Sequence, residues 1–157
     1  MEADVKHPDG FRREPYGYQV DFDDEIATGL SMTEALKIND DAPFVIDHLA
    51  LEMRLYAASG NAVAGTPLPR VPYPGTTNVN QIPTLALVRV QIKISDRNLF
   101  NVPVRASLVT GTGDNQAWFG IRPILPAGET VRVTIYNDSA LSIVGNVLFM
   151  GAKRKQR

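Results

Sequence analysis

Hydrophobic residues recur at every second position in several separate stretches of this sequence. They do so in YGYQVDF (16–22), TLALVRVQIKIS (84–95) and TVRVTIYND (130–138). Because successive side chains of a β-strand point to opposite faces, this spacing predicts strands with one buried face. The residues predicted to face the core are Tyr16, Tyr18, Val20, Phe22, Ala86, Val88, Val90, Ile92, Ile94, Val131, Val133 and Ile135.

Other stretches are rich in β-branched and aromatic residues and are bounded by turn-forming residues, which also predicts strands. They are FVIDHLALEMRLY (44–56), VPVRASLVT (102–110), WFGIRPIL (118–125) and IVGNVLFMGAK (143–153). The fragment MTEALKI (32–38) is too short for its period to separate a strand from a helical turn. Many short strands with turns between them predict an all-β fold, an antiparallel β-sandwich or jelly roll.

Turn signals bracket the strand at 130–137. Pro126 and Gly128 predict a hairpin-type turn before it. Asn137 and Asp138 predict a second turn after it, because their side chains can cap their own backbone. The stretch from Leu125 to Asp138 is therefore interpreted as one strand of a meander.

The 157 residues are expected to form one domain with two appendages. We expect an extended acidic N-terminal arm with one or two strands at 1–40, a sandwich at 41–152 and a basic tail at 153–157. Within the sandwich, 57–83 holds five prolines and three glycines and is predicted to be a long loop. Loops longer than about 12–15 residues are usually functional or disordered.

Charge is divided unevenly along the chain, although the net charge is only −1. Residues 1–52 hold 13 acidic and 4 basic side chains (−9), and residues 53–157 hold 4 acidic and 12 basic ones (+8). The acidic segment could lie on its own basic body, or it could reach onto the basic face of a neighbouring copy.

Composition narrows the functional classes. Cysteine is absent, so disulfides, thiolate nucleophiles and cysteine metal sites are excluded. No apolar run reaches the roughly 18 residues of a membrane span, and the opening MEADVKHPDG lacks the apolar core of a secretion signal. We expect synthesis in the cytoplasm and no membrane partner. The basic tail could touch phosphates, but its few charges predict only weak, salt-sensitive affinity, so a nucleic-acid partner is not expected.

The residue types that carry chemistry form no convincing motif. His48 follows Asp47, but neighbouring strand residues point to opposite faces, so the two cannot form an acid–base pair without a bulge. The run Asp23-Asp24-Glu25 lacks the ligand spacing of a calcium loop. The stretch GTGDN (111–115) is not followed by the Lys-Ser/Thr of a phosphate-binding loop. We expect no catalytic residue, no cofactor and no metal.

Two parts of the chain show a family resemblance. The segments are INDDAPFVIDHLAL (38–51) and the ordered series SDRNLF (95–100), VPVRASLVTG (102–111) and WFGIRPILPAGETVRVTIYNDSALSIVGNVLFMGAKR (118–154). Together they resemble small structural proteins of tailed bacteriophage virions, in which a Pro-Ala-Gly turn opens a strand and the last strand ends in Gly-x-Lys-Arg. The resemblance covers roughly residues 39–154 as a diffuse pattern, and no catalytic residue comes with it. It implies a β-sandwich subunit added to the head, the neck or a fibre attachment point of a phage particle.

The leading hypothesis is therefore a non-enzymatic virion protein that binds assembled capsid, neck or fibre subunits, as a decoration (cement) or collar protein. A homo-oligomer or symmetric array is expected. Apolar loop residues would supply most of the binding energy, and the basic tail would dock on carboxylates of an adjacent chain. The candidate partner-binding residues are Leu68, Val71, Tyr73, Trp118, Lys153, Arg154, Lys155 and Arg157.

Two other classes remain open. A carbohydrate-binding sandwich for host attachment would display Trp118, Tyr73 or Tyr56 to glycans. A hydrolase would use Asp47 and His48, or the carboxylates of 23–25 gathered around a metal.

Overall fold

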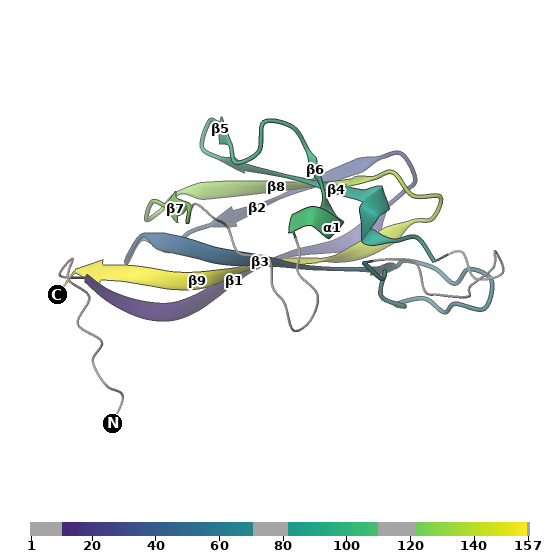
Figure 1. The fold of residues 1–157 in the computed structure, drawn as a ribbon, viewed down its shortest axis with the longest axis horizontal. Coiled ribbons are helices and arrows are strands. Elements are labelled where there is room, and N and C mark those ends of the chain that lie inside the picture. Colours follow the sequence, from purple (N-terminus) through teal and green to yellow (C-terminus); the bar gives the residue numbers. More distant parts are fainter. Residues whose placement is uncertain (1–10, 71–81, 110–121, 157) are drawn as a thin grey trace, which may run out of the picture.

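The protein is a sandwich of two antiparallel β-sheets, seen in a computed structural model that describes residues 11–70, 82–109 and 122–156 (Figure 1). Sheet A has the strand order β1-β9-β3-β7, and sheet B has the order β2-β8-β4-β5, with β6 also pairing with β4. The strands of sheet A are β1 (Phe11–Ile26), β9 (Ile143–Gln156), β3 (Phe44–Leu55) and β7 (Ile124–Leu125). Those of sheet B are β2 (Ser31–Lys37), β8 (Thr130–Asn137), β4 (Val88–Ile94), β5 (Arg97–Asn98) and β6 (Val104–Arg105). The predicted all-β antiparallel sandwich is confirmed.

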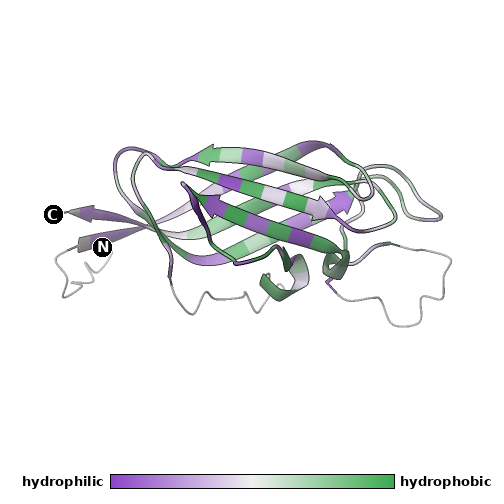
Figure 2. Ribbon diagram, turned by 90° about the horizontal axis from the view of Figure 1, so that it is seen from above, coloured by the Kyte–Doolittle hydropathy of each residue, from purple (hydrophilic) through white to green (hydrophobic). Residues whose placement is uncertain are grey.

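The core lies between the sheets, on the faces that the alternation predicts. Hydrophobic and hydrophilic residues alternate along the strands (Figure 2). In sheet B, Val90 lies opposite Ile135 and Ile92 opposite Val133, and all four side chains are fully buried. Burying a side chain of this size contributes roughly 1.5–3 kcal/mol each, so these rows are a main source of stability. Three predicted inward residues are exposed or only partly buried: Tyr16 is 38% exposed, Ile94 is partly buried, and Ala86 is partly buried in a 3-10 helix at 85–87 instead of a strand.

The first part of the chain belongs to the sandwich. β1 pairs with β9 from Phe11 to Phe22 and at Ile26, and β2 pairs with β8. Phe22 and Ile26 of β1 are fully buried. The acidic residues of β1 do not prevent burial, because they lie at exposed positions between or beyond the buried ones, and only Glu34 of β2 is partly buried. The expected arm is therefore wrong for 11–37, and residues 1–10 lie outside the described part.

Some local predictions differ from the structure. The described part of the stretch 102–110, residues 102–109, forms only the short β6 and then a single helical turn, α1 (Ala106–Val109), because tertiary context overrides strand propensity where the chain leaves the edge of sheet B. In 118–125, β7 covers Ile124–Leu125 and residues 118–121 lie outside the described part. The fragment 32–38 forms β2, and Leu85–Leu87 forms a 3-10 helix, η1. No helix in the described ranges has the length and apolar character needed to cross a membrane.

Two glycines let the neighbouring strands β9 and β3 approach closely. A Cβ atom at Gly151 would collide with the carbonyl oxygen of Val45, and one at Gly145 would collide with the carbonyl oxygen of Glu52. The register between the two strands also shifts between Ile46 and His48, next to Gly151. The close packing of β9 against β3 in sheet A therefore requires residues without a side chain at these two positions.

Candidate functional site

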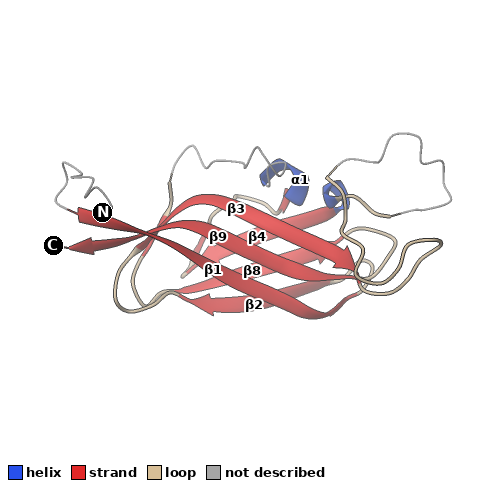
Figure 3. Ribbon diagram, turned by 90° about the horizontal axis from the view of Figure 1, so that it is seen from below, coloured by secondary structure: helices blue, strands red, loops and turns tan. Residues whose placement is uncertain are grey.

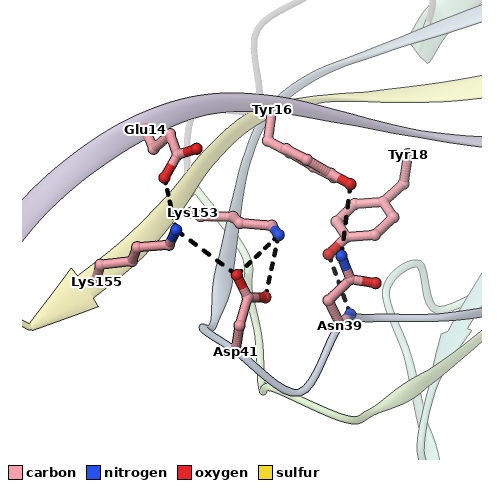
Figure 4. A network of polar contacts seen from close by, with 7 residues as sticks. All are labelled: Glu14, Tyr16, Tyr18, Asn39, Asp41, Lys153 and Lys155. Atoms are coloured by element: carbon pink, nitrogen blue, oxygen red, sulfur yellow. Dashed lines mark hydrogen bonds and ion pairs between the residues drawn. The ribbon is translucent and has the colours of Figure 1, made fainter.

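Charged and aromatic side chains gather where the end of β9 meets β1 and the β2–β3 connection (Figure 4). We call this group the β9-end cluster, and its members are Glu14, Tyr16, Tyr18, Asn39, Asp41, Lys153 and Lys155. Alternation places the even-numbered residues of β1 and the odd-numbered residues of β9 on one face, since Glu14 lies opposite Lys153 in the ladder. The cluster is therefore built by strand register.

Lys153 lies at the centre of the cluster. Its Nζ donates to both carboxylate oxygens of Asp41 at 3.0 Å and lies 4.0 Å from the ring centroid of Tyr16. The residue is only 5% exposed. Burial acts to lower the pKa of Lys153, but the hydrogen bonds and negative charge of Asp41 outweigh it and raise the pKa above its ordinary value. Lys153 is thus a buried, paired cation.

Asp41 and Glu14 hold the second lysine. Lys155 Nζ lies 2.8 Å from Glu14 Oε2 and 3.7 Å from Asp41 Oδ2. The hydrogen bond from Lys155 lowers the pKa of Glu14, and that from Lys153 lowers the pKa of Asp41. Both carboxylates therefore stay ionised under mildly acidic conditions, and Asp41 bridges the two lysines.

The tyrosines fix the β2–β3 connection against β1. The backbone N–H of Asn39 donates to the hydroxyl of Tyr18 at 3.1 Å, and its side-chain amide donates to the hydroxyl of Tyr16 at 3.4 Å. The Tyr18 ring meets Phe44 edge-on, with centroids 5.0 Å apart. Such aromatic pairs contribute roughly 0.5–1.5 kcal/mol beyond their burial. The cluster therefore joins three segments that are distant in the sequence.

The tail residues consequently do not occupy a free basic end. The expectation that Lys153 docks on an adjacent chain is wrong, because its charge is buried against Asp41 of its own chain. Lys155 is half-exposed and already paired with Glu14. Arg154 is part of β9, and its backbone N–H donates to the carbonyl of Pro43 at 2.8 Å. Arg157 lies outside the described residues. At this cluster, the charge asymmetry of the sequence is satisfied within the chain.

The predicted apolar and aromatic binding residues are not all placed at an exposed surface. Leu68 is only 6% exposed, and its N–H donates to the carbonyl of Met53 at 2.8 Å. An isolated bridge between Arg54 and Pro67 brings this segment against β3, so Leu68 is a core residue and its predicted role in partner binding is wrong. Val71, Tyr73 and Trp118 lie outside the described residues. Tyr56, the remaining glycan-binding candidate, is 47% exposed at the end of β3.

The residues considered for a hydrolase site make contacts within the fold. The ladder shift between Ile46 and His48 places a bulge at Asp47, so the expected strict alternation fails at this point. Asp47 Oδ1 lies 3.2 Å from Nε of Arg122. The run 23–25 is exposed, and Glu25 accepts a hydrogen bond from the hydroxyl of Ser142. Among the described residues, no three histidine, aspartate or glutamate side chains are grouped as metal ligands would be.

A cleft of about 550 Å³ lies beside the β4–β5 hairpin. Ile94, Leu99 and Ile124 give it apolar walls, while Arg97 and Glu129 are among its polar lining residues. Ile124 is 52% exposed there. The cleft therefore offers apolar contact area on the side of the molecule away from β1.

Comparison of the chain with protein-family models gives no match, and comparison with curated protein sequences gives none either.

Proposed function

We propose that this chain is a non-enzymatic structural protein of a tailed-bacteriophage virion, which attaches to assembled capsid or neck subunits as a decoration or collar protein. The observation that carries the proposal is the pairing of Asp41 with Lys153. Asp41 belongs to the segment INDDAPF and Lys153 to the segment GAKR. These are two of the segments that resemble the phage proteins, and in the fold they meet in one cluster.

The design of this cluster suits a subunit that must hold its shape on a particle. The chain has no cysteine for a covalent cross-link, and its last strand lies between β1 and β3 in sheet A. Ion pairs and strand ladders on both sides of β9 resist its removal from the sheet. Attachment would come from many weak contacts repeated by particle symmetry.

The test compares particles produced with and without this chain. We expect mass spectrometry to detect the chain in purified particles, and cryo-electron microscopy to show extra density at symmetry-related positions only when the chain is present. Identical particles, with the chain found only in the unbound fraction, would refute the proposal. Binding of the isolated chain to host glycans, without particle density, would support the carbohydrate-binding alternative instead.

A further inference from the structure

The strand β1 forms one edge of sheet A (Figure 3). One side of it pairs with β9 from Phe11 to Phe22 and again at Ile26, and residues 23–25 form a bulge between these two stretches. On its other side, residues 12–25 form no backbone hydrogen bond within the described ranges of the chain. Its neighbour in sequence, β2, belongs to the other sheet. A long edge of this kind presents unpaired N–H and C=O groups to any strand that fits.

The position of Pro15 is consistent with an edge strand. Pro15 lies opposite Ala152 in the ladder, and a proline, which has no N–H, is tolerated in a sheet where its nitrogen faces away from the neighbouring strand. It removes one donor from the open side. Gly17, Gln19 and Asp21 follow with the same strand phase, so their N–H groups face the open side and can still donate.

Charge is distributed along this edge in a self-complementary way. Arg12 and Arg13 lie near the start of β1, and Asp23 and Asp24 lie near its end. All four residues are exposed, and none of them forms an ion pair with another described residue.

We propose that two copies of the chain pair through their β1 edges, antiparallel and about a twofold axis at Tyr18. This register brings Arg12 and Arg13 of one copy alongside the β1 bulge of the second copy, which carries Asp23 and Asp24, and the twofold axis repeats the contact. A parallel arrangement would set the arginines of one copy beside those of the other. Opposite charges across antiparallel strands stabilise a pair and like charges destabilise it, so the charge pattern selects the antiparallel register.

The pairing would also extend the core of sheet A. Tyr18, Val20 and Phe22 are buried on the inward face of β1, and in this register the same residues of the second copy continue that face. The two sheets would then form one sheet across a self-complementary interface. This inference concerns the free chain and does not depend on attachment to a particle.

The test is sedimentation equilibrium of the full-length chain over a range of protein and salt concentrations. We expect a dimer. Its dissociation constant should rise at least tenfold in the double variant Arg12→Asp with Arg13→Asp, and by a similar factor in the double variant Asp23→Arg with Asp24→Arg. Reversing all four charges in one chain restores the dimer, and mixing the two double variants gives a heterodimer. A matched control for the arginine variant, Arg97→Asp with Arg105→Asp, lowers the net charge by the same amount at exposed positions of β5 and β6 and leaves the dimer unchanged.

Several results would overturn the inference: a wild type that stays monomeric, a dimer indifferent to both double variants, or a folded four-charge variant that does not dimerise. If a double variant fails to fold by circular dichroism, the neutral pair Arg13→Gln and Asp23→Asn is used, and unchanged dimerisation of that pair counts against the inference. Amide hydrogen exchange gives an independent readout, because Gly17 and Gln19 should exchange more slowly as the protein concentration rises. Since particle binding is measured separately, failure of the dimer is distinguishable from failure of the proposed function.

Discussion

The side-chain amide of Asn137 donates a hydrogen bond of 2.8 Å to the carbonyl oxygen of Ile26. Asn137 ends β8 in sheet B and Ile26 ends β1 in sheet A, so this contact ties the two sheets together. The same amide also donates to the carbonyl of Leu141 at 2.8 Å, and its oxygen accepts from the backbone N–H of Ser139 at 3.0 Å. Asn137 is fully buried, and both ends of its amide are satisfied.

Replacing Asn137 with alanine should therefore be costly. The change leaves the carbonyl of Ile26 without its amide donor in a buried site, while the carbonyl of Leu141 keeps the hydroxyl of Ser139 as a donor. We expect this to lower the free energy of unfolding by roughly 2–3 kcal/mol. Urea unfolding measures it. Asn98→Ala on β5 is the control, since Asn98 is exposed. Equal stability of Asn137→Ala and the wild type would show that water replaces the amide.

Breaking the β9-end cluster at Asp41 should also destabilise the fold. Asp41→Ala leaves Lys153 buried without its carboxylate, and an unpaired buried charge is strongly unfavourable. The matched control is Asp40→Ala, because Asp40 pairs with Lys37 at 3.3 Å with both side chains mostly exposed. Exposed pairs are worth about 0–1 kcal/mol, so the urea midpoint should fall clearly for Asp41→Ala and hardly for Asp40→Ala. Similar midpoints for the two variants would contradict a structural role for the cluster.

The β9-end cluster also predicts that the stability of the fold depends on pH in the acidic range. Folding lowers the pKa of Glu14 from 4.5 and that of Asp41 from 3.8. A carboxyl group whose pKa is lower in the folded state stabilises the fold above its unfolded pKa, and this contribution is lost as the pH falls through the folded pKa. We expect urea midpoints to fall steeply below these ordinary values. The variant Glu14→Gln with Asp41→Asn should show a shallower fall, and an unchanged slope would rule out these two groups as the cause.

The alternating stretches could be predicted well because their information is local. The inward positions of Val88, Val90 and Ile92 follow from period two alone, and all three are fully buried. The fragment 32–38 could not be decided locally, because its strand state depends on pairing with β8, which lies about a hundred residues later. Likewise, the burial of Leu68 depends on a bridge between Arg54 and Pro67 that no periodicity indicates.

The candidate site was harder to predict. The charge asymmetry indicated attraction between the two parts of the chain, but it could not say whether the pairs form within one copy or between copies. That choice depends on the register of β1 with β9 and on the β2–β3 connection, which together bring Asp41 to Lys153 across 112 residues. The Asp47 bulge is a similar case, because a bulge is set by the neighbouring strand and cancels the alternation from which side-chain direction is inferred.

The last prediction concerns Gly151 and uses the close approach of β9 to β3. Gly151→Ala places a Cβ against the carbonyl oxygen of Val45, a backbone atom that cannot rotate away, whereas a Cβ at Gly17 on β1 meets its nearest atoms at an ordinary 3.5 Å. We expect Gly151→Ala to lower the free energy of unfolding by about 1–3 kcal/mol, as overpacking does, and Gly17→Ala to change it far less. Urea unfolding of both variants decides the matter. If Gly151→Ala is as stable as Gly17→Ala, the two strands have room to separate, and the close approach is not needed to hold β9 in sheet A.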